Sequence, residues 1–521
     1  MRGFQASLLA LTLFISAPQF ASADTLQQQT RLIPEARDPA TEIQQGMQAA
    51  IQRYRAGDLA GTERALRAIM PDLVEVPPKQ RYAAYSLLAM CEQGEGQTQA
   101  AYADMVRAGD EYPAGRSALY WQDVAALAAL ANRPEAAVDA YTNAVTADPA
   151  GVNDLNSGAM GEVWFLAKQL NDDGMRRENL LRALWQAGYA PNNVDDRIAT
   201  QDLWFDLFQF DANRGLDDEA KQVLAKIDQP WMVIGVRADK RYRRFAKDDA
   251  SLDGGPAMVA RYVDNTRKLA DAHPRNISAV NELARALIST DQLPQALEVL
   301  DNTLAKVNSA AAGAPPFDNI KDDLRWTLDM RARVLAKLGR WDDALAAQHA
   351  ARDEALRNGG DDVSQQRINL GVLLYRMQRP REALAEIDHL DKNETSSMGD
   401  MEAEEVRACA AAQIGDAREL HATLAVMRKH GDDAPQALRL ALECANDQAG
   451  LAKMMIRRLA EPATRNDELA AVQTYLPDPN PSEFDRTMET RWKTVLARSD
   501  VRAAVARYGD IKSYPVFPPA Y

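Results

Sequence analysis

The chain has little cysteine and, beyond its N-terminus, no long apolar run. Three cysteines occur among 521 residues, with no C-x-x-C pair, which excludes the disulfide-dense class of small domains. We interpret Cys91, Cys409 and Cys444 as small core residues, and a Cys409–Cys444 bridge between adjacent helices stays open as the alternative. No later segment reaches the roughly 20 apolar residues that a membrane-spanning helix needs, so no transmembrane segment is predicted.

The spacings of common catalytic and cofactor sites are also missing. No Gly-Lys pair occurs, which excludes a phosphate-binding P-loop, and neither H-E-x-x-H nor G-x-S-x-G is present. The five histidines are scattered along the chain. We therefore predict no catalytic residue, no cofactor and no metal site, and expect a protein that is not an enzyme.

The charge balance is acidic, with a formal net charge of −14 at pH 7. A chain of this sign repels nucleic acid phosphates, so no nucleic acid partner is expected. Apolar residues make up 46% and charged residues 26% of the chain. These are the proportions of an ordinary folded protein.

The N-terminus has the three parts of a secretory signal peptide. Arg2 supplies a positive start, Ser7 to Ala17 is apolar, and Ala21-Ser22-Ala23 is an A-x-A site before Asp24. We predict a signal peptide over residues 1–23, cleavage near Ala23, and a mature protein that is periplasmic or secreted. The alternative is an N-terminal amphipathic or disordered tail.

Most of the remaining chain shows helical periodicity, with alanine and leucine at spacings of three and four. Short breaks carry Gly, Asn, Asp or Pro, as in Gly57-Asp58, Asn132-Arg133-Pro134 and Gly339-Arg340. In the clearest unit, residues 118–151, a first helix and a second helix each have a regular apolar face, and the unit closes on a proline: Trp121, Val124, Ala125 and Ala128, then Ala137, Tyr141 and Ala144, then Pro149.

This pattern resembles the tetratricopeptide repeat (TPR) family, whose unit of about 34 residues has this register. The resemblance covers most of the mature chain with divergent repeats, and with the signal peptide it suggests an exported bacterial member. A small residue recurs at one second-helix position in most of the units: Thr62, Ala101, Ala137, Ala220, Ala296, Ala344 and Ala383. The resemblance implies an all-α fold, a right-handed α-solenoid of TPR-like hairpins with a C-terminal cap.

The repeat pattern is clear in some parts of the chain and weak in others, and this difference predicts four regions. We expect N-terminal TPR-like repeats over 24–151, divergent aromatic-rich helical repeats over 152–274, TPR-like repeats over 275–430, and a helical cap with a Pro-rich tail over 431–521. Within the second region, residues 231–236 (WMVIGV) are open to a short extended piece as well as to a helix.

The resemblance also places a concave groove along the first helices, with certain repeat positions facing it. Carried onto this chain, those positions give a partner-binding set of Asn281, Arg285, Trp326, Asp329, Arg333, Asn369, Tyr375 and Arg376. Aromatic and arginine side chains dominate binding energy at interfaces. The set therefore favours a protein or peptide partner.

The function predicted from these features is a non-catalytic, protein-binding scaffold or adaptor in the bacterial envelope, as a monomer or small oligomer. A competing hypothesis is a glycan-binding or glycan-processing protein that uses the aromatics of residues 152–274. One further hypothesis is that the Pro-rich end, Ser513 to Tyr521, occupies the chain's own groove.

Overall fold

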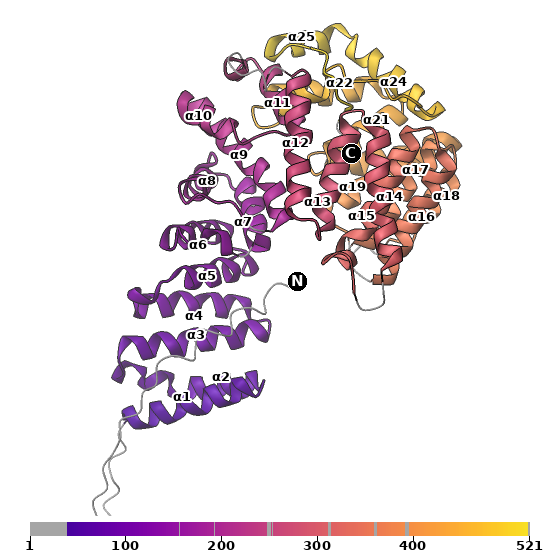
Figure 1. Cartoon of the computed structure of the whole chain (residues 1–521). Helices are drawn as coiled ribbons and strands as arrows, with labels where there is room; N and C mark the ends of the chain where they lie inside the picture. Colours follow the sequence, from indigo (N-terminus) through magenta and orange to yellow (C-terminus); the bar gives the residue numbers. More distant parts are fainter. Residues whose placement is uncertain are drawn as a thin grey trace, which may run out of the picture. The chain divides into compact units, whose positions relative to one another are not determined.

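The computed structural model describes residues 39–155, 157–191, 193–246, 252, 254–310, 314–358, 362–390 and 395–518. The predicted signal peptide, residues 1–23, lies outside these ranges. Inside them the chain is a succession of α-helices joined by short turns (Figure 1), and its β pairing is limited to two isolated bridges, Asp239–Gly509 and Thr474–Ser513. The predicted fold class, an all-α solenoid of helical hairpins, is confirmed.

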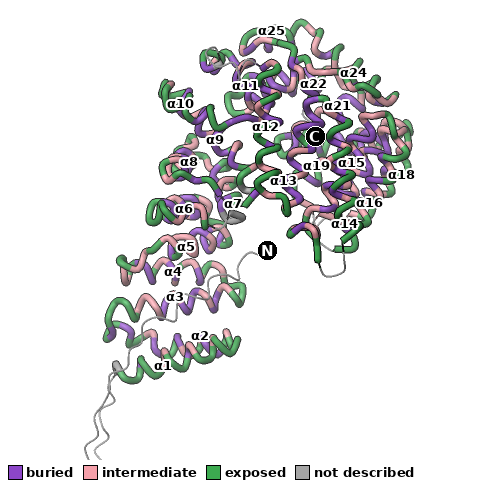
Figure 2. The backbone as a smooth tube through the Cα atoms, viewed as in Figure 1, coloured by how far each residue is buried: buried purple, intermediate pink, exposed green. Residues whose placement is uncertain are grey.

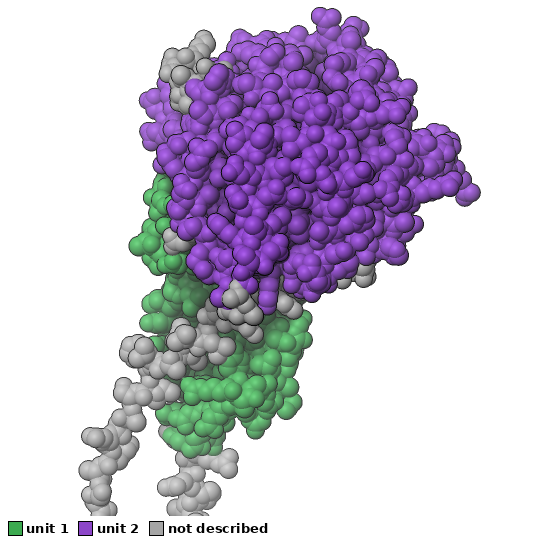
Figure 3. Space-filling model, turned by 45° about the vertical axis from the view of Figure 1, so that its right-hand side comes forward, with its two compact units in different colours: residues 1–192 green, residues 193–521 purple. Residues whose placement is uncertain are grey.

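The chain forms two compact units, residues 1–192 and 193–521 (Figure 3), which divide inside the predicted middle region. The helices of unit 1 are α1 (Pro39–Arg55), α2 (Leu59–Ile69), α3 (Pro78–Gly94), α4 (Thr98–Glu111), α5 (Ala118–Leu130), α6 (Pro134–Ala147), α7 (Ser157–Gln169) and α8 (Met175–Gln186).

Unit 2 continues the series with longer hairpins and then a group of shorter helices. These are α9 (Val194–Arg214), α10 (Asp217–Leu224), α11 (Pro230–Ala238), α12 (Pro256–Ala272), α13 (Ile277–Ser289), α14 (Leu293–Ser309), α15 (Ile320–Lys337), α16 (Trp341–Asn358), α17 (Asp362–Arg376), α18 (Pro380–Ile387), α19 (Ser397–Ile414), α20 (Ala417–Lys429), α21 (Pro435–Cys444), α22 (Gln448–Ala460), α23 (Arg465–Ala471), α24 (Glu483–Leu496) and α25 (Ser499–Tyr508).

Small residues at one position allow the helices of a hairpin to approach each other. Figure 2 shows buried residues where the helices of each unit face one another. The seven small residues that keep the predicted repeat phase are all fully buried: Thr62, Ala101, Ala137, Ala220, Ala296, Ala344 and Ala383. A larger side chain at these positions would hold the two helices apart.

The turns follow the predicted breaks. Gly57, with φ +78°, takes the left-handed conformation between α1 and α2, and Asp58 then accepts a 2.8 Å hydrogen bond from the backbone N–H of Gly61 at the start of α2. Asn132, with φ +54°, takes the same conformation before Pro134 begins α6.

Unit 2 joins its beginning to its end. Helix α11 packs against α23, and the strand-like residues beside α11 pair with those after α25. The N–H of Lys240 donates to the carbonyl of Tyr508 at 3.0 Å, and the N–H of Asp510 donates to the carbonyl of Ala238 at 3.2 Å. The open alternative of an extended piece at residues 231–236 is wrong, because these residues lie inside α11.

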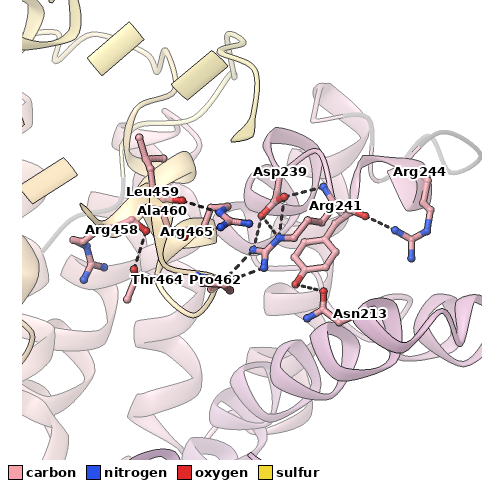
Figure 4. Close-up of polar contacts among 11 residues, drawn as sticks. Asn213, Asp239, Arg241, Arg244, Arg458, Leu459, Ala460, Pro462, Thr464 and Arg465 are labelled. Carbon is pink, nitrogen blue, oxygen red and sulfur yellow. Dashed lines mark hydrogen bonds and ion pairs between the residues drawn. The ribbon is translucent and has the colours of Figure 1, made fainter. Parts of the chain in front are cut away.

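A buried ion pair holds this junction (Figure 4). The carboxylate of Asp239 is fully buried and accepts bonds of 2.9 and 2.6 Å from the guanidinium of Arg241, which also donates to the carbonyl of Pro462 at 3.3 Å. The neighbouring Arg243 and Arg244 pair with carboxylates of Asp510 and Asp217. The basic run after α11 is therefore used inside unit 2.

A disulfide joins Cys409 of α19 to Cys444 of α21. The preferred interpretation of these two cysteines as reduced core residues is wrong, and the alternative of a bridge is the one the structure shows. Both residues are buried where the two helices meet, with Cα atoms 5.1 Å apart. Such a separation is within the range that a disulfide can span.

The last described residues, 509–518, are extended, as their prolines predict. They do not form a free tail, because Tyr514, Val516 and Phe517 are buried. The N–H of Leu476 donates to the carbonyl of Val516 at 2.9 Å, and the N–H of Phe517 donates to the carbonyl of Ser289 at 2.8 Å. This segment packs at the C-terminal end of α13.

The disulfide is expected to stabilise unit 2. It closes a loop with a sequence separation of 35 residues, and loop-closure entropy for that length predicts about 3–4 kcal/mol. A Cys409→Ala/Cys444→Ala variant should therefore unfold at lower denaturant concentration, followed by helical circular dichroism. Unreduced, fully denatured wild type should react with a thiol reagent at Cys91 alone, and an equal midpoint for variant and wild type would contradict the expectation.

Candidate functional site

The predicted partner-binding residues lie on successive first helices of unit 2, and side-chain hydrogen bonds link these helices. The hydroxyl of Thr327 on α15 donates to the amide oxygen of Asn281 on α13 at 2.9 Å. The amide of Asn369 on α17 donates to the carboxylate of Asp329 on α15, also at 2.9 Å. We call this series the polar ladder, and its last rung is Gln365 on α17, donating to Glu402 on α19 at 2.8 Å.

Three members of the predicted set, Asn281, Asp329 and Asn369, form hydrogen bonds of the ladder, and the first two are buried. Asn281 and Asp329 are buried, and their polar atoms bond to the adjacent helix. The expectation that they stand exposed on a groove wall is wrong. Polar groups buried between closely spaced helices must find partners there, so both residues set the contact between hairpins.

Three other members reach solvent. The side chain of Arg285 is 66% exposed, and Trp326 and Arg333 are partly exposed. Each arginine is oriented by a buried carboxylate on its own helix: Arg285 pairs with Glu282 at 3.1 Å and Arg333 pairs with Asp329 at 2.7 Å. The guanidinium groups are thereby held in place along the exposed edge of the ladder.

Glu282 itself is tied to the preceding helix. Its carboxylate accepts a 3.1 Å hydrogen bond from the hydroxyl of Tyr262 on α12. Burial raises the pKa of Glu282, and the charge of Arg285 opposes that rise. The position of Arg285 thus depends on contacts that extend from α12 to α13.

Tyr375 and Arg376, at the end of α17, serve the packing of α24. Tyr375 is fully buried, with its ring 5.0 Å from that of Phe484, so its prediction as a groove contact is wrong. Arg376 makes two 2.9 Å bonds to the carboxylate of Asp485. Burial acts to raise the pKa of Asp485, but the charge of Arg376 opposes it, and the pKa of Asp485 lies below its ordinary value.

The hydroxyl of Tyr375 donates to a buried carboxyl group on α19. The distance to Glu405 is 2.7 Å. Burial raises the pKa of Glu405 to about 8, while the bond from Tyr375 opposes the rise. Burial likewise raises the pKa of Glu443, to about 7. The core around the disulfide therefore holds two carboxyl groups whose pKa values lie near neutral pH, well above the ordinary value of a glutamate.

The C-terminal segment and the loop between α23 and α24 both contact the end of α15. The ammonium of Lys337, at the end of α15, lies 4.1 Å from the centre of the Phe517 ring and 3.4 Å from the carboxylate of Asp478. The amide of Asn480 donates to the carbonyl of Lys337 at 2.8 Å. Sequence reasoning missed these contacts, because no local pattern relates residues so far apart in the chain.

The aromatics of the middle region mainly fill the core. Phe208 is fully buried, and its ring centre lies 5.3 Å from that of Tyr242 and 5.3 Å from that of Phe245. Trp204 and Phe205 are buried as well. Phe165 is 58% exposed, and four further aromatics of this region are partly exposed: Trp164, Trp185, Phe210 and Trp231. Because the largest cluster of these rings, around Phe208, is packed inside the core, the structure does not favour the glycan hypothesis.

The described ranges contain no group of three or more His, Cys, Asp or Glu side chains arranged as a metal site. Among the helices in those same ranges, none combines the length and apolar character needed to cross a bilayer.

Replacing Glu405 with Gln should change the pH dependence of stability. In the unfolded chain this carboxyl ionises near 4.5, whereas in the fold it keeps its proton to about pH 8. The wild type therefore loses stability as the pH rises across that window, by about 1.4 kcal/mol for each unit of raised pKa. Glu405→Gln keeps an acceptor for Tyr375 and removes this loss. Denaturant titrations between pH 4.5 and 8.5 measure it.

The matched control is Glu489→Gln, an exposed position on α24. Its stability profile should run parallel to that of the wild type. A Glu405→Gln profile that also ran parallel to the wild type would show that Glu405 ionises alike in both states.

Comparison with known proteins gives no family assignment. No family model matches the chain, and no curated protein matches it. Similar solved structures include a Rap protein complexed with competence and sporulation factor (11% identity, 88% of this chain and 99% of that chain, TM-score 0.29). A second is Naa15/Naa10 bound to HypK-THB, with 14% identity over 90% of this chain and 79% of that chain and a TM-score of 0.25. A third is the TPR domain of P58(IPK), with 13% identity over 78% of this chain and 99% of that chain and a TM-score of 0.21.

Proposed function

We propose that this protein is an exported, non-catalytic scaffold that holds a protein partner in the bacterial envelope. The partner contacts the exposed edge of the polar ladder in unit 2. Arg285, Trp326 and Arg333 supply the contact, and the ladder keeps the helices that carry them in register.

The observation that carries the proposal is the orientation of exposed arginines by buried carboxylates. An interface gains most from Trp, Tyr and Arg side chains that are already held in place, because less freedom is lost on binding. Arg285 and Arg333 each have such an anchor, at 3.1 and 2.7 Å. The partly exposed Trp326 lies on the same helix as Arg333.

Export is supported by two separate features of the chain. The first 23 residues have the composition of a signal peptide. The Cys409–Cys444 disulfide suits an oxidising compartment such as a periplasm, since cytosolic thiols are usually kept reduced.

Capture from an envelope extract tests the partner site. The mature chain should retain a specific protein, identified by mass spectrometry, and Arg285→Ala or Trp326→Ala should reduce the retained amount by about tenfold or more, as for central interface residues. Trp326→Ala should melt like the wild type, because the Trp326 side chain is partly exposed. Arg285→Ala leaves the buried carboxylate of Glu282 without its arginine, so its melting temperature is compared with that of a control that loses the same kind of pair.

Arg357→Ala is the matched control. Arg357 on α16 is 69% exposed and pairs with the buried Glu354 three residues before it, as Arg285 pairs with Glu282. This variant should retain the partner in full. Equal retention by Arg285→Ala, Trp326→Ala and wild type would place binding elsewhere.

Export has its own test. The full chain, produced in a Gram-negative host, should appear in the periplasmic fraction with Asp24 as its first residue, as read by N-terminal sequencing. Replacing Leu8 and Leu9 with Arg should interrupt the apolar run and leave the precursor in the cytoplasm. A wild-type product that keeps Met1 and stays in the cytoplasm would contradict export.

A further inference from the structure

One face of α5 in unit 1 presents two leucines to solvent, with a carboxylate between them. Leu119, Asp123, Ala126 and Leu130 follow one another at helical spacings of four, three and four. Leu119 is 39% and Leu130 is 48% exposed, and Ala126 is partly exposed. The buried residues of α5 lie at other positions: Tyr120, Val124, Ala125, Leu127 and Ala128. We call the four-residue row the α5 strip.

Asp123 is the one charged residue in the α5 strip, and its carboxylate lacks a partner. Among the residues that the structure describes, none donates a hydrogen bond to it or forms an ion pair with it. Other carboxylates of unit 1 are paired, such as Glu111 with Arg81 at 2.7 Å and Asp139 with Arg176 at 3.0 Å. The negative charge of Asp123 acts on the hydroxyl of Tyr82 on α3: burial raises the pKa of Tyr82, and the charge of Asp123 adds to that rise.

An unpaired, partly buried carboxylate in an apolar row works against folding. Burial raises the pKa of Asp123 to about 6, which means that its charged form is disfavoured where it lies. An asparagine would remove that cost without changing shape. Because the Asp123 carboxylate destabilises the fold and has no partner within it, it is suited to pair with a cationic side chain of a binding partner.

We propose that the α5 strip binds a protein segment that places a lysine or arginine on Asp123 and apolar side chains on the two leucines that flank it. The acidic character of the whole chain, at −14, favours approach of such a basic segment. The inference rests on the proposed scaffold function, but it assigns a second surface, in unit 1, with its own specificity.

The test uses two synthetic 12-residue peptides, identical and leucine-rich except for a central lysine or a central glutamine. Binding to the mature full-length protein is measured by calorimetry at pH 7.5. The lysine peptide should bind about tenfold more tightly, the usual effect of one charge-assisted bond. Asp123→Asn should remove this preference, and Leu130→Ser should weaken both peptides.

Glu135→Gln is the control, since it removes one exposed charge from α6 in the same unit. It should keep the lysine preference. Lowering the pH below about 6 should abolish the preference in the wild type, because protonated Asp123 no longer attracts a cation. Asp123→Asn should melt no lower than the wild type at pH 7.5, which separates loss of binding from loss of fold.

Equal affinity for both peptides in the wild type, or a lysine preference that survives in Asp123→Asn, would overturn the inference. Either result leaves the envelope capture through Arg285 and Trp326 untouched. Failure of that capture together with an Asp123-dependent peptide preference would instead overturn the unit 2 site and retain the α5 strip.

Discussion

The distance at which two helices of a hairpin can meet governs the architecture of both units. Side chains at the contact set that distance, and in most hairpins one small residue of the second helix allows the backbones to approach closely. Ala101 and Ala137 in unit 1, and Ala296, Ala344 and Ala383 in unit 2, are all fully buried at that contact. Repeated at most hairpins, the same approach aligns the first helices side by side, and it is this alignment that lets polar side chains bond from one to the next.

The alignment explains why the repeat architecture was predictable from sequence and the fate of single polar residues was not. Alanine at a fixed phase leaves a periodic signal, because most hairpins need the same small residue. Asn281 and Asp329 were correctly placed on first helices, yet whether they face solvent or the next helix depends on groups such as Thr327 and Asn369, which lie about one repeat away. Periodicity predicts which face of its own helix a side chain lies on. It does not predict which polar groups of the neighbouring repeat lie opposite that face.

Long-range contacts set a second limit on sequence reasoning. Arg376 and Asp485 are 109 residues apart, and Arg241 meets the carbonyl of Pro462 across 221 residues. The spacing from Ser482 to Asp485 is typical of a helix capping box, and the structure contains one there. That local signal predicts the start of α24, but it carries no information about the helix end against which α24 packs. The cysteines show the same limit, since only their proximity in space decides between thiols and a bridge.

The first helices of the two units differ in whether their buried carboxylates have hydrogen-bond or ion-pair partners. In unit 2 the carboxylates of Asp329 and Glu282 are satisfied by arginines and by neighbouring helices, so their burial adds to the fold. In unit 1 the carboxylate of Asp123 is withdrawn from water without such compensation. Folding alone gives no reason to keep a charge there, because a neutral side chain of equal size would cost less. A residue that lowers the stability of the fold, with no compensating contact nearby, marks a candidate binding position.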